Sequence, residues 1–73
     1  MGKSRIRNNI RKLRFFRDEM TQQQLAEMVG VTRQTIIAME QEKYSPSLEL
    51  AFRIARVFDV PLEEVFSYED VSK

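Results

Sequence analysis

One segment, from Thr21 to Glu40, constrains the fold of this chain more than any other. Its order is T-x-x-Q-L-A-x-x-V-G-V-T-x-x-T-I-x-x-x-E. Thr21 is followed three residues later by Gln24, which is the capping-box arrangement of a helix start. Gly30 is well placed to end this helix, because glycine adopts the left-handed backbone conformation of a helix C-terminus at little cost. The segment therefore begins with a short helix that stops sharply at a glycine.

A second helix is predicted almost immediately afterwards. Only the dipeptide Gly30-Val31 separates the first helix from Thr32, a residue type favoured at helix N-caps. The second helix is expected to extend to about Gln41, with Ile36 and Met39 buried. The residues left on its outer side are Arg33, Gln34, Ile37, Ala38 and Gln41. Two short helices joined through such a turn form a helix-turn-helix.

The segment before Thr21 predicts another amphipathic helix. Its apolar residues recur at spacings of four and three, and they are Ile6, Ile10, Leu13 and Phe16. Either Asn8 or Asn9 is suited to cap the start of this helix. In that case residues 5–7 form a short extended arm ahead of the helix.

Two more helices and a strand are predicted after the segment. Ser47 is suited to cap a helix whose apolar positions have helical spacing, and these are Leu48, Ala51, Ile54, Ala55 and Phe58. Residues 59–61 interrupt it, and Pro61 suits the first turn of a short helix over residues 62–66. Residues 65–68 then alternate apolar and polar side chains, as a short strand does.

Length and composition exclude several function classes. The chain has 73 residues, enough for one small domain, and contains neither cysteine nor histidine. Disulfides, Cys/His zinc sites and the usual nucleophile and general base are therefore absent, so we expect no enzyme, metal or cofactor. No apolar run approaches the ~18 residues of a membrane span, so a cytoplasmic protein is expected. The sequence shows no evident small-molecule site, and oligomerisation is the expected source of extra stability.

Charge is distributed unevenly along the chain, although the net charge is only +1. Seven basic residues precede the first acidic residue, Asp18, whereas residues 59–73 carry five acidic residues and one lysine. Such a molecule can turn its basic end toward phosphate groups. Solvated helix faces explain the same pattern equally well, so charge alone does not decide the function.

From about Asn9 to Phe66, the sequence resembles the Cro/C1-type helix-turn-helix family of phage repressors and small bacterial and archaeal regulators. The residues that carry the resemblance are 10–14, 21–26, 29–36, Glu40 and 44–51. The R-Q-T-I and K-Y-x-P-S-L-x-L-A blocks are most similar to its short single-domain subgroup. One departure is visible, because residues 14–21 contain one residue more than usual, with Asp18-Glu19 in place of a glycine. Either the connection is lengthened there or the helix is extended, which leaves the burial of Phe15 and Phe16 open.

The resemblance implies an all-α fold, a compact five-helix λ-repressor-like domain over residues 1–73. The helix-turn-helix spans about 21–41 and its recognition helix about 32–41. Short strands near Arg5–Arg7 and Phe66–Glu69 are expected to pair. The implied function is that of a sequence-specific regulator of double-stranded DNA, a repressor that binds a palindromic operator as a homodimer. An antitoxin-type DNA-binding protein and a protein-binding adaptor on the same fold are the alternatives.

The recognition helix supplies the candidate base contacts, namely Arg33, Gln34, Thr35 and Ala38. In the major groove, Arg33 can bind guanine and Gln34 can bind adenine, each through two hydrogen bonds. Thr35 and Ala38 are small enough to contact a thymine methyl group. A phosphate contact is the alternative for Arg33, and Ile37 is either a methyl contact or ordinary surface.

The candidate phosphate contacts lie at helix N-termini and after the recognition helix, and they are Gln22, Gln23, Thr32, Lys43, Tyr44 and Ser45. Gln22 resembles a family glutamine that binds phosphate, although a plain solvent-facing residue is the alternative. Tyr44 can instead pack over the following helix. Arg14 and Glu40 resemble a salt-bridged pair of the family, and we interpret them as structural.

The C-terminal half carries more large apolar residues than one small core needs. The candidate dimer face consists of Leu50, Phe58, Val65, Phe66 and Tyr68. An ordinary core is the alternative for the same residues.

Overall fold

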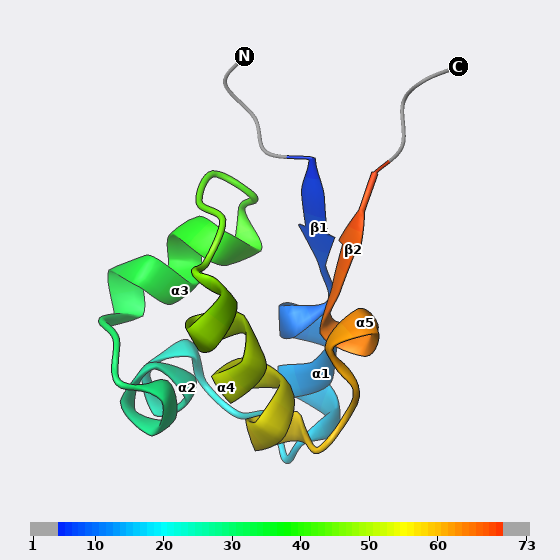
Figure 1. Ribbon diagram of the computed structural model, residues 1–73. Helices are drawn as coiled ribbons and strands as arrows, with labels where there is room; N and C mark the ends of the chain where they lie inside the picture. Colours follow the sequence, from blue (N-terminus) through cyan, green and yellow to red (C-terminus); the bar gives the residue numbers. More distant parts are fainter. Residues whose placement is uncertain (1–4, 70–73) are drawn as a thin grey trace.

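The computed structural model describes residues 5–69 (Figure 1). Over these residues, five helices lie between two short strands. In chain order the elements are β1 (Ile6–Asn8), α1 (Ile10–Phe16), α2 (Gln22–Val29), α3 (Arg33–Glu40), α4 (Leu48–Phe58), α5 (Leu62–Val65) and β2 (Phe66–Tyr68). The fold is thus mostly helical, with a small two-stranded sheet, as the sequence predicts.

The sheet joins the two ends of the described chain. β1 and β2 are antiparallel, with Ile6 opposite Tyr68 and Asn8 opposite Phe66. In Figure 1 the two strands project side by side from the helical body. The arm predicted before the first helix is therefore a paired strand. Ile6 belongs to this strand and not to the helical stripe.

The core lies among α2, α3, α4 and the start of α1. Its largest fully buried side chains are Ile10, Leu25, Val29, Ile36, Met39, Ile54 and Val65. Burying one large aliphatic side chain stabilises a fold by about 1.5–3 kcal/mol. Ile36 and Met39 are the residues through which α3 is anchored, so the opposite side of α3 is left for contacts with other molecules.

Two apolar positions of the predicted helical stripes are exposed. Leu48 is 69% exposed, because it lies in the first turn of α4 at the edge of the buried stripe. Phe16 is 71% exposed, and Phe15 beside it is exposed as well. α1 ends at Phe16, and Met20 from the following connection packs into the core. The helical periodicity of the sequence therefore predicted burial for one residue in α1 and one in α4 that the structure leaves exposed.

The connection between α1 and α2 is irregular. Asp18 and Glu19 both have left-handed backbones, with φ of 57° and 53°. This conformation costs a non-glycine residue roughly 1–2 kcal/mol. α1 therefore ends at Phe16 and does not continue through Asp18 and Glu19, which lie in an irregular turn.

Candidate nucleic-acid interface

α2 and α3 form a helix-turn-helix with the predicted caps. Thr21 Oγ1 accepts a hydrogen bond from the Gln24 amide at 3.0 Å, and Gln24 Oε1 accepts one from the Thr21 amide at 2.8 Å. Gly30 ends α2 with φ of +79°. Thr32 Oγ1 accepts from the Thr35 amide at 3.2 Å, which fixes the start of α3. Local bonds thus define both the turn and the first residues of α3.

The first turn of α3 presents its long polar side chains to solvent. Arg33 and Gln34 are exposed, whereas Thr35 and Ala38 are half-buried. The Thr35 hydroxyl lies 3.0 Å from that of Thr32. Ile37 is half-buried too, and it lines a groove of about 580 Å³ together with Arg33 and with residues of α1 and α2. Arg33, Gln34 and Thr35 therefore lie in the first turn of α3, Ala38 lies one turn further along, and Arg33 also lines the groove.

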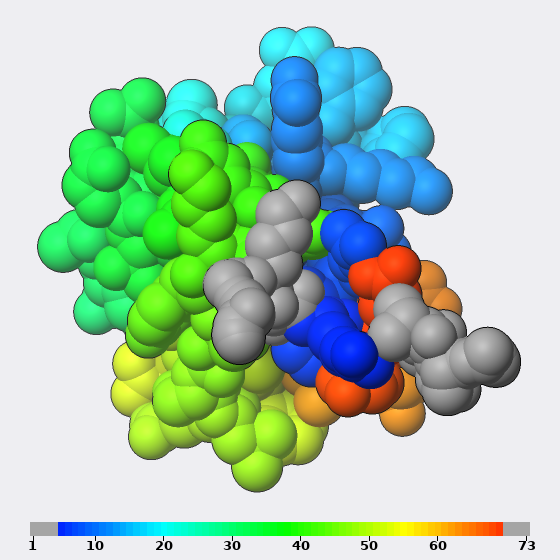
Figure 2. All heavy atoms as spheres, turned by 90° about the horizontal axis from the view of Figure 1, so that it is seen from above, coloured from blue at the N-terminus to red at the C-terminus, as the bar shows by residue number. Residues whose placement is uncertain are grey.

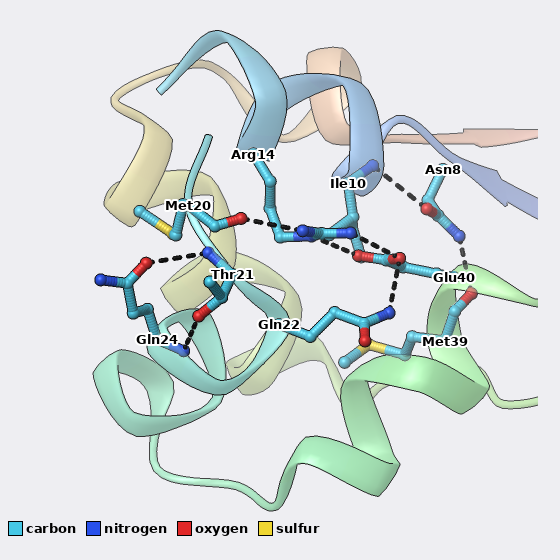
Figure 3. Close-up of polar contacts among 9 residues, drawn as sticks. All are labelled: Asn8, Ile10, Arg14, Met20, Thr21, Gln22, Gln24, Met39 and Glu40. Atoms are coloured by element: carbon cyan, nitrogen blue, oxygen red, sulfur yellow. Dashed lines mark hydrogen bonds and ion pairs between the residues drawn. The ribbon is translucent and has the colours of Figure 1, made fainter. Parts of the chain in front are cut away.

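A polar network ties the three helices around this groove together (Figure 3). Arg14 binds Glu40 through two parallel hydrogen bonds, Nε to Oε2 at 2.7 Å and Nη2 to Oε1 at 3.0 Å. Arg14 Nη1 also donates to the Met20 carbonyl at 2.8 Å. Only 14% of the Arg14 side chain and 10% of the Glu40 side chain are exposed. The structure thus brings α1 and the end of α3 together through a nearly buried, bidentate ion pair.

Gln22 belongs to the same network. Its Nε2 donates to Glu40 Oε1 at 3.1 Å, so the start of α2 is bound to the end of α3. A side-chain amide nitrogen carries two N–H groups, and one is left for a further acceptor. Gln23, by contrast, points along α2 and donates to exposed Glu27 at 3.0 Å. The two candidate phosphate contacts therefore differ, since Gln22 is also a structural residue.

The loop after α3 holds the other candidate phosphate contacts. The Glu42 amide donates to the Met39 carbonyl and the Lys43 amide to the Ala38 carbonyl, each at 2.9 Å. With Glu42 left-handed at φ of 63°, this is a Schellman ending. Lys43, Tyr44 and Ser45 follow and are exposed, with Tyr44 at 45%. They lie at the opposite end of α3 from Arg33 and Gln34.

Sequence reasoning missed two residues of β1 that contact the end of α3. Asn8 Nδ2 donates to the Met39 carbonyl at 2.8 Å. Arg7 forms ion pairs with both Glu42 and Glu69. The carboxylates of Glu69 and Glu42 raise the pKa of Arg7 above its ordinary value through hydrogen bonds and charge. Nothing in the local sequence signals these contacts, because the partners are distant in the chain.

The candidate dimer face requires a correction. Leu50, Phe58 and Val65 are buried in the core of this chain, since α4 and α5 pack these side chains inward. They are not available to a second copy. Phe66 is half-buried against the core, and Tyr68 is exposed. Only these two of the five predicted residues reach the surface.

Comparison with known proteins agrees with this geometry. The profile of the helix-turn-helix family matches residues 10–65, which include all five helices. The chain belongs to this family. Its members are DNA-binding transcriptional regulators and not enzymes, and the resemblance to the Cro/C1-type regulators is confirmed. None of the helices within residues 5–69 is long and apolar enough to cross a membrane.

Individual relatives cover most of this helix-turn-helix protein. It is 54% identical over 61 residues to an uncharacterized HTH-type transcriptional regulator of Methanocaldococcus jannaschii, covering 81% of this chain and 92% of that one. It is 37% identical over 60 residues to the cryptic phage CTXphi transcriptional repressor RstR of Vibrio cholerae, covering 82% and 53% respectively. The crystal structure of a candidate DNA-binding protein from Bacteroides fragilis has the same fold. Its TM-score is 0.73 at 24% identity, with coverage of 85% of this chain and 98% of that one.

Proposed function

We propose that this chain is a sequence-specific repressor that binds double-stranded DNA through α3 in the major groove. The observation that carries the proposal is the placement of Arg33 and Gln34. Both are exposed on the first turn of a helix whose other side is anchored by Ile36 and Met39. In helix-turn-helix complexes the N-terminal residues of the second helix contact base edges.

Base selection is assigned to the outer side of α3. Arg33 binds guanine O6 and N7, and Gln34 binds adenine N6 and N7, each worth about 1–3 kcal/mol of discrimination. The Thr35 hydroxyl is already bonded to Thr32. Thr35 is therefore expected to use its methyl group, as Ala38 does, against a thymine methyl.

Phosphate contacts fix the orientation of α3. The N-termini of α2 and α3 offer amides and a partial positive charge to the DNA backbone, with Gln22, Gln23 and Thr32 beside them. Lys43, Tyr44 and Ser45 provide a second group of contacts at the other end of α3. The Gln22 amide keeps one N–H for this purpose while the other holds Glu40.

We also propose that the chain represses transcription as a homodimer bound to a palindromic operator. The relative RstR is a transcriptional repressor. We expect this chain likewise to repress by occupying a promoter, and to do so in the cytoplasm. Two copies related by a two-fold axis bind half-sites about 34 Å apart. Exposed Tyr68 and half-buried Phe66 are the retained candidates for the contact between copies.

Selection of bound duplexes from a random pool tests the function, with the full chain at moderate salt. The expected result is a palindrome with half-sites about one helical turn apart. Binding that is salt-sensitive and blind to sequence would overturn the proposal and favour a protein-binding adaptor.

Two matched substitutions then separate base from phosphate contacts. Gln34→Ala is expected to relax preference at one position of each half-site. Gln23→Ala truncates the same type of side chain on α2, where it donates a hydrogen bond to exposed Glu27. This variant should lower the affinity for all duplexes alike. If both variants lost affinity equally on every duplex, the assignment of Gln34 to base contact would be wrong.

A further inference from the structure

The small sheet contacts the end of the recognition helix through Arg7. Its guanidinium lies between two carboxylates, with Nη1 donating to Glu42 and Nη2 donating to Glu69. Glu42 belongs to the ending of α3, and Glu69 directly follows β2. One β1 side chain therefore connects both ends of the described chain to the loop after α3.

Asn8 reinforces this contact one residue later. Its Nδ2 donates to the Met39 carbonyl at the end of α3, and its Oδ1 accepts from the Ile10 amide at the start of α1. Successive residues of a strand point to opposite sides, so Arg7 and Asn8 reach α3 by different routes. β1 is thus attached to the C-terminal end of α3 at two points, through Arg7 and through Asn8.

Glu42 is an unexpected residue for its position. Its backbone is left-handed at the C-terminus of α3, where glycine is usual, and its side chain is only 20% exposed. It also directly precedes Lys43, Tyr44 and Ser45, the proposed phosphate contacts. An unpaired carboxylate there would repel the DNA backbone. Arg7, whose single charge is shared with Glu69, offsets part of the charge of Glu42 and holds its carboxylate against β1.

The surface view agrees with this arrangement. In Figure 2, β1 in dark blue, β2 in red and the yellow-green segment after α3 occupy the same face of the molecule. The sheet and the proposed phosphate-contacting loop therefore lie on one face of the molecule.

We propose that Arg7 is a positioning residue for DNA binding, which offsets the charge of Glu42 and fixes the loop after α3 against the terminal sheet. The inference rests on the proposed function, because it assumes that Lys43, Tyr44 and Ser45 contact phosphates. Arg7 itself need not touch DNA. Its effect on affinity passes through Glu42, and this sets it apart from an ordinary basic contact.

Variants that remove one charge test whether the effect of Arg7 on DNA affinity passes through Glu42. Arg7→Gln leaves Glu42 charged and is expected to weaken binding to the selected duplex by about tenfold. The double variant Arg7→Gln/Glu42→Gln should recover most of that loss, and Glu42→Gln alone should bind at least as tightly as the original chain. Arg5→Gln is the matched control, because Arg5 lies two residues away and has no ion pair within residues 5–69. It should lose less than about threefold.

A readout on the free protein measures the positioning directly. Hydrogen exchange at the Lys43 amide should become faster in Arg7→Gln and stay unchanged in Arg5→Gln. Circular dichroism checks that every variant is folded.

The possible results separate this inference from the proposed function. If the double variant stays as weak as Arg7→Gln, or Arg5→Gln is equally weak, the route through Glu42 is overturned while the function stands. If the original chain selects no duplex, both proposals fall together.

Discussion

The two ends of the recognition helix are held in different ways. The N-terminal end of α3 is fixed by its own neighbours, with Gly30 in the turn and Thr32 as the cap. The C-terminal end is fixed by residues far away in the chain, since Asn8 binds Met39 and Arg14 binds Glu40. The end with the proposed base contacts is thus built locally. The end with the loop depends on the assembled fold.

The largest effect is expected from breaking the distant attachment at Glu40. Glu40→Ala leaves nearly buried Arg14 without its carboxylate and should lower the free energy of unfolding by about 3 kcal/mol. Urea denaturation followed by circular dichroism measures the loss. The matched control is Glu49→Ala, which removes an exposed pair with Arg53 and should cost less than about 0.5 kcal/mol. Equal losses would show that burial of the Arg14–Glu40 pair is energetically unimportant.

A smaller effect is expected from breaking the local end at Gly30. A Cβ at this position would meet Arg53 Nη1 at 3.6 Å, which is an ordinary contact. The cost of Gly30→Ala therefore comes from the left-handed backbone and should be roughly 1–2 kcal/mol of unfolding free energy. The same urea titration measures it. A variant as stable as the original chain would contradict the requirement for glycine in this turn.

These two ends also show what the sequence can and cannot predict. The capping box at Thr21, the turn at Gly30 and the cap at Thr32 depend on neighbouring residues, so their pattern is visible in the sequence. The pairing of the two strands was predicted from the resemblance to the Cro/C1-type family. The ion pairs of Arg7 and the hydrogen bond of Asn8 depend on how distant elements pack, and no local pattern encodes them.

The candidate site likewise contains features that the sequence predicts and features that it does not. The exposure of Arg33 and Gln34 follows from the helical period that buries Ile36 and Met39. The hydrogen bond from Gln22 to Glu40 does not, because the two residues are eighteen positions apart in the chain. The predicted dimer face failed for Leu50, since an apolar residue on a helix does not reveal whether its own chain or another covers it.

The smallest effect on stability is expected from a substitution at Glu42, at the C-terminal end of α3. Glu42→Gly removes the left-handed strain, worth about 1 kcal/mol, and also the partly exposed ion pair with Arg7. These terms oppose each other, so the midpoint of urea denaturation should change little. Hydrogen exchange should nevertheless become faster at the amides of Lys43 and Glu69. A clear fall in that midpoint would mean that the ion pair stabilises the fold by more than the left-handed backbone of Glu42 costs.

The pairing of β1 with β2 has a consequence for the order of folding. Closing this sheet joins residues separated by almost the whole described chain, and such contacts carry a large loop-closure entropy. During translation α2 and α3 leave the ribosome before β2 does. The turn and cap of the recognition helix can therefore form on a nascent chain, whereas the Arg7 contact with Glu69 must wait for the last strand. Competence for tight DNA binding is then expected to arrive only after residue 69 has left the ribosome and the sheet has closed.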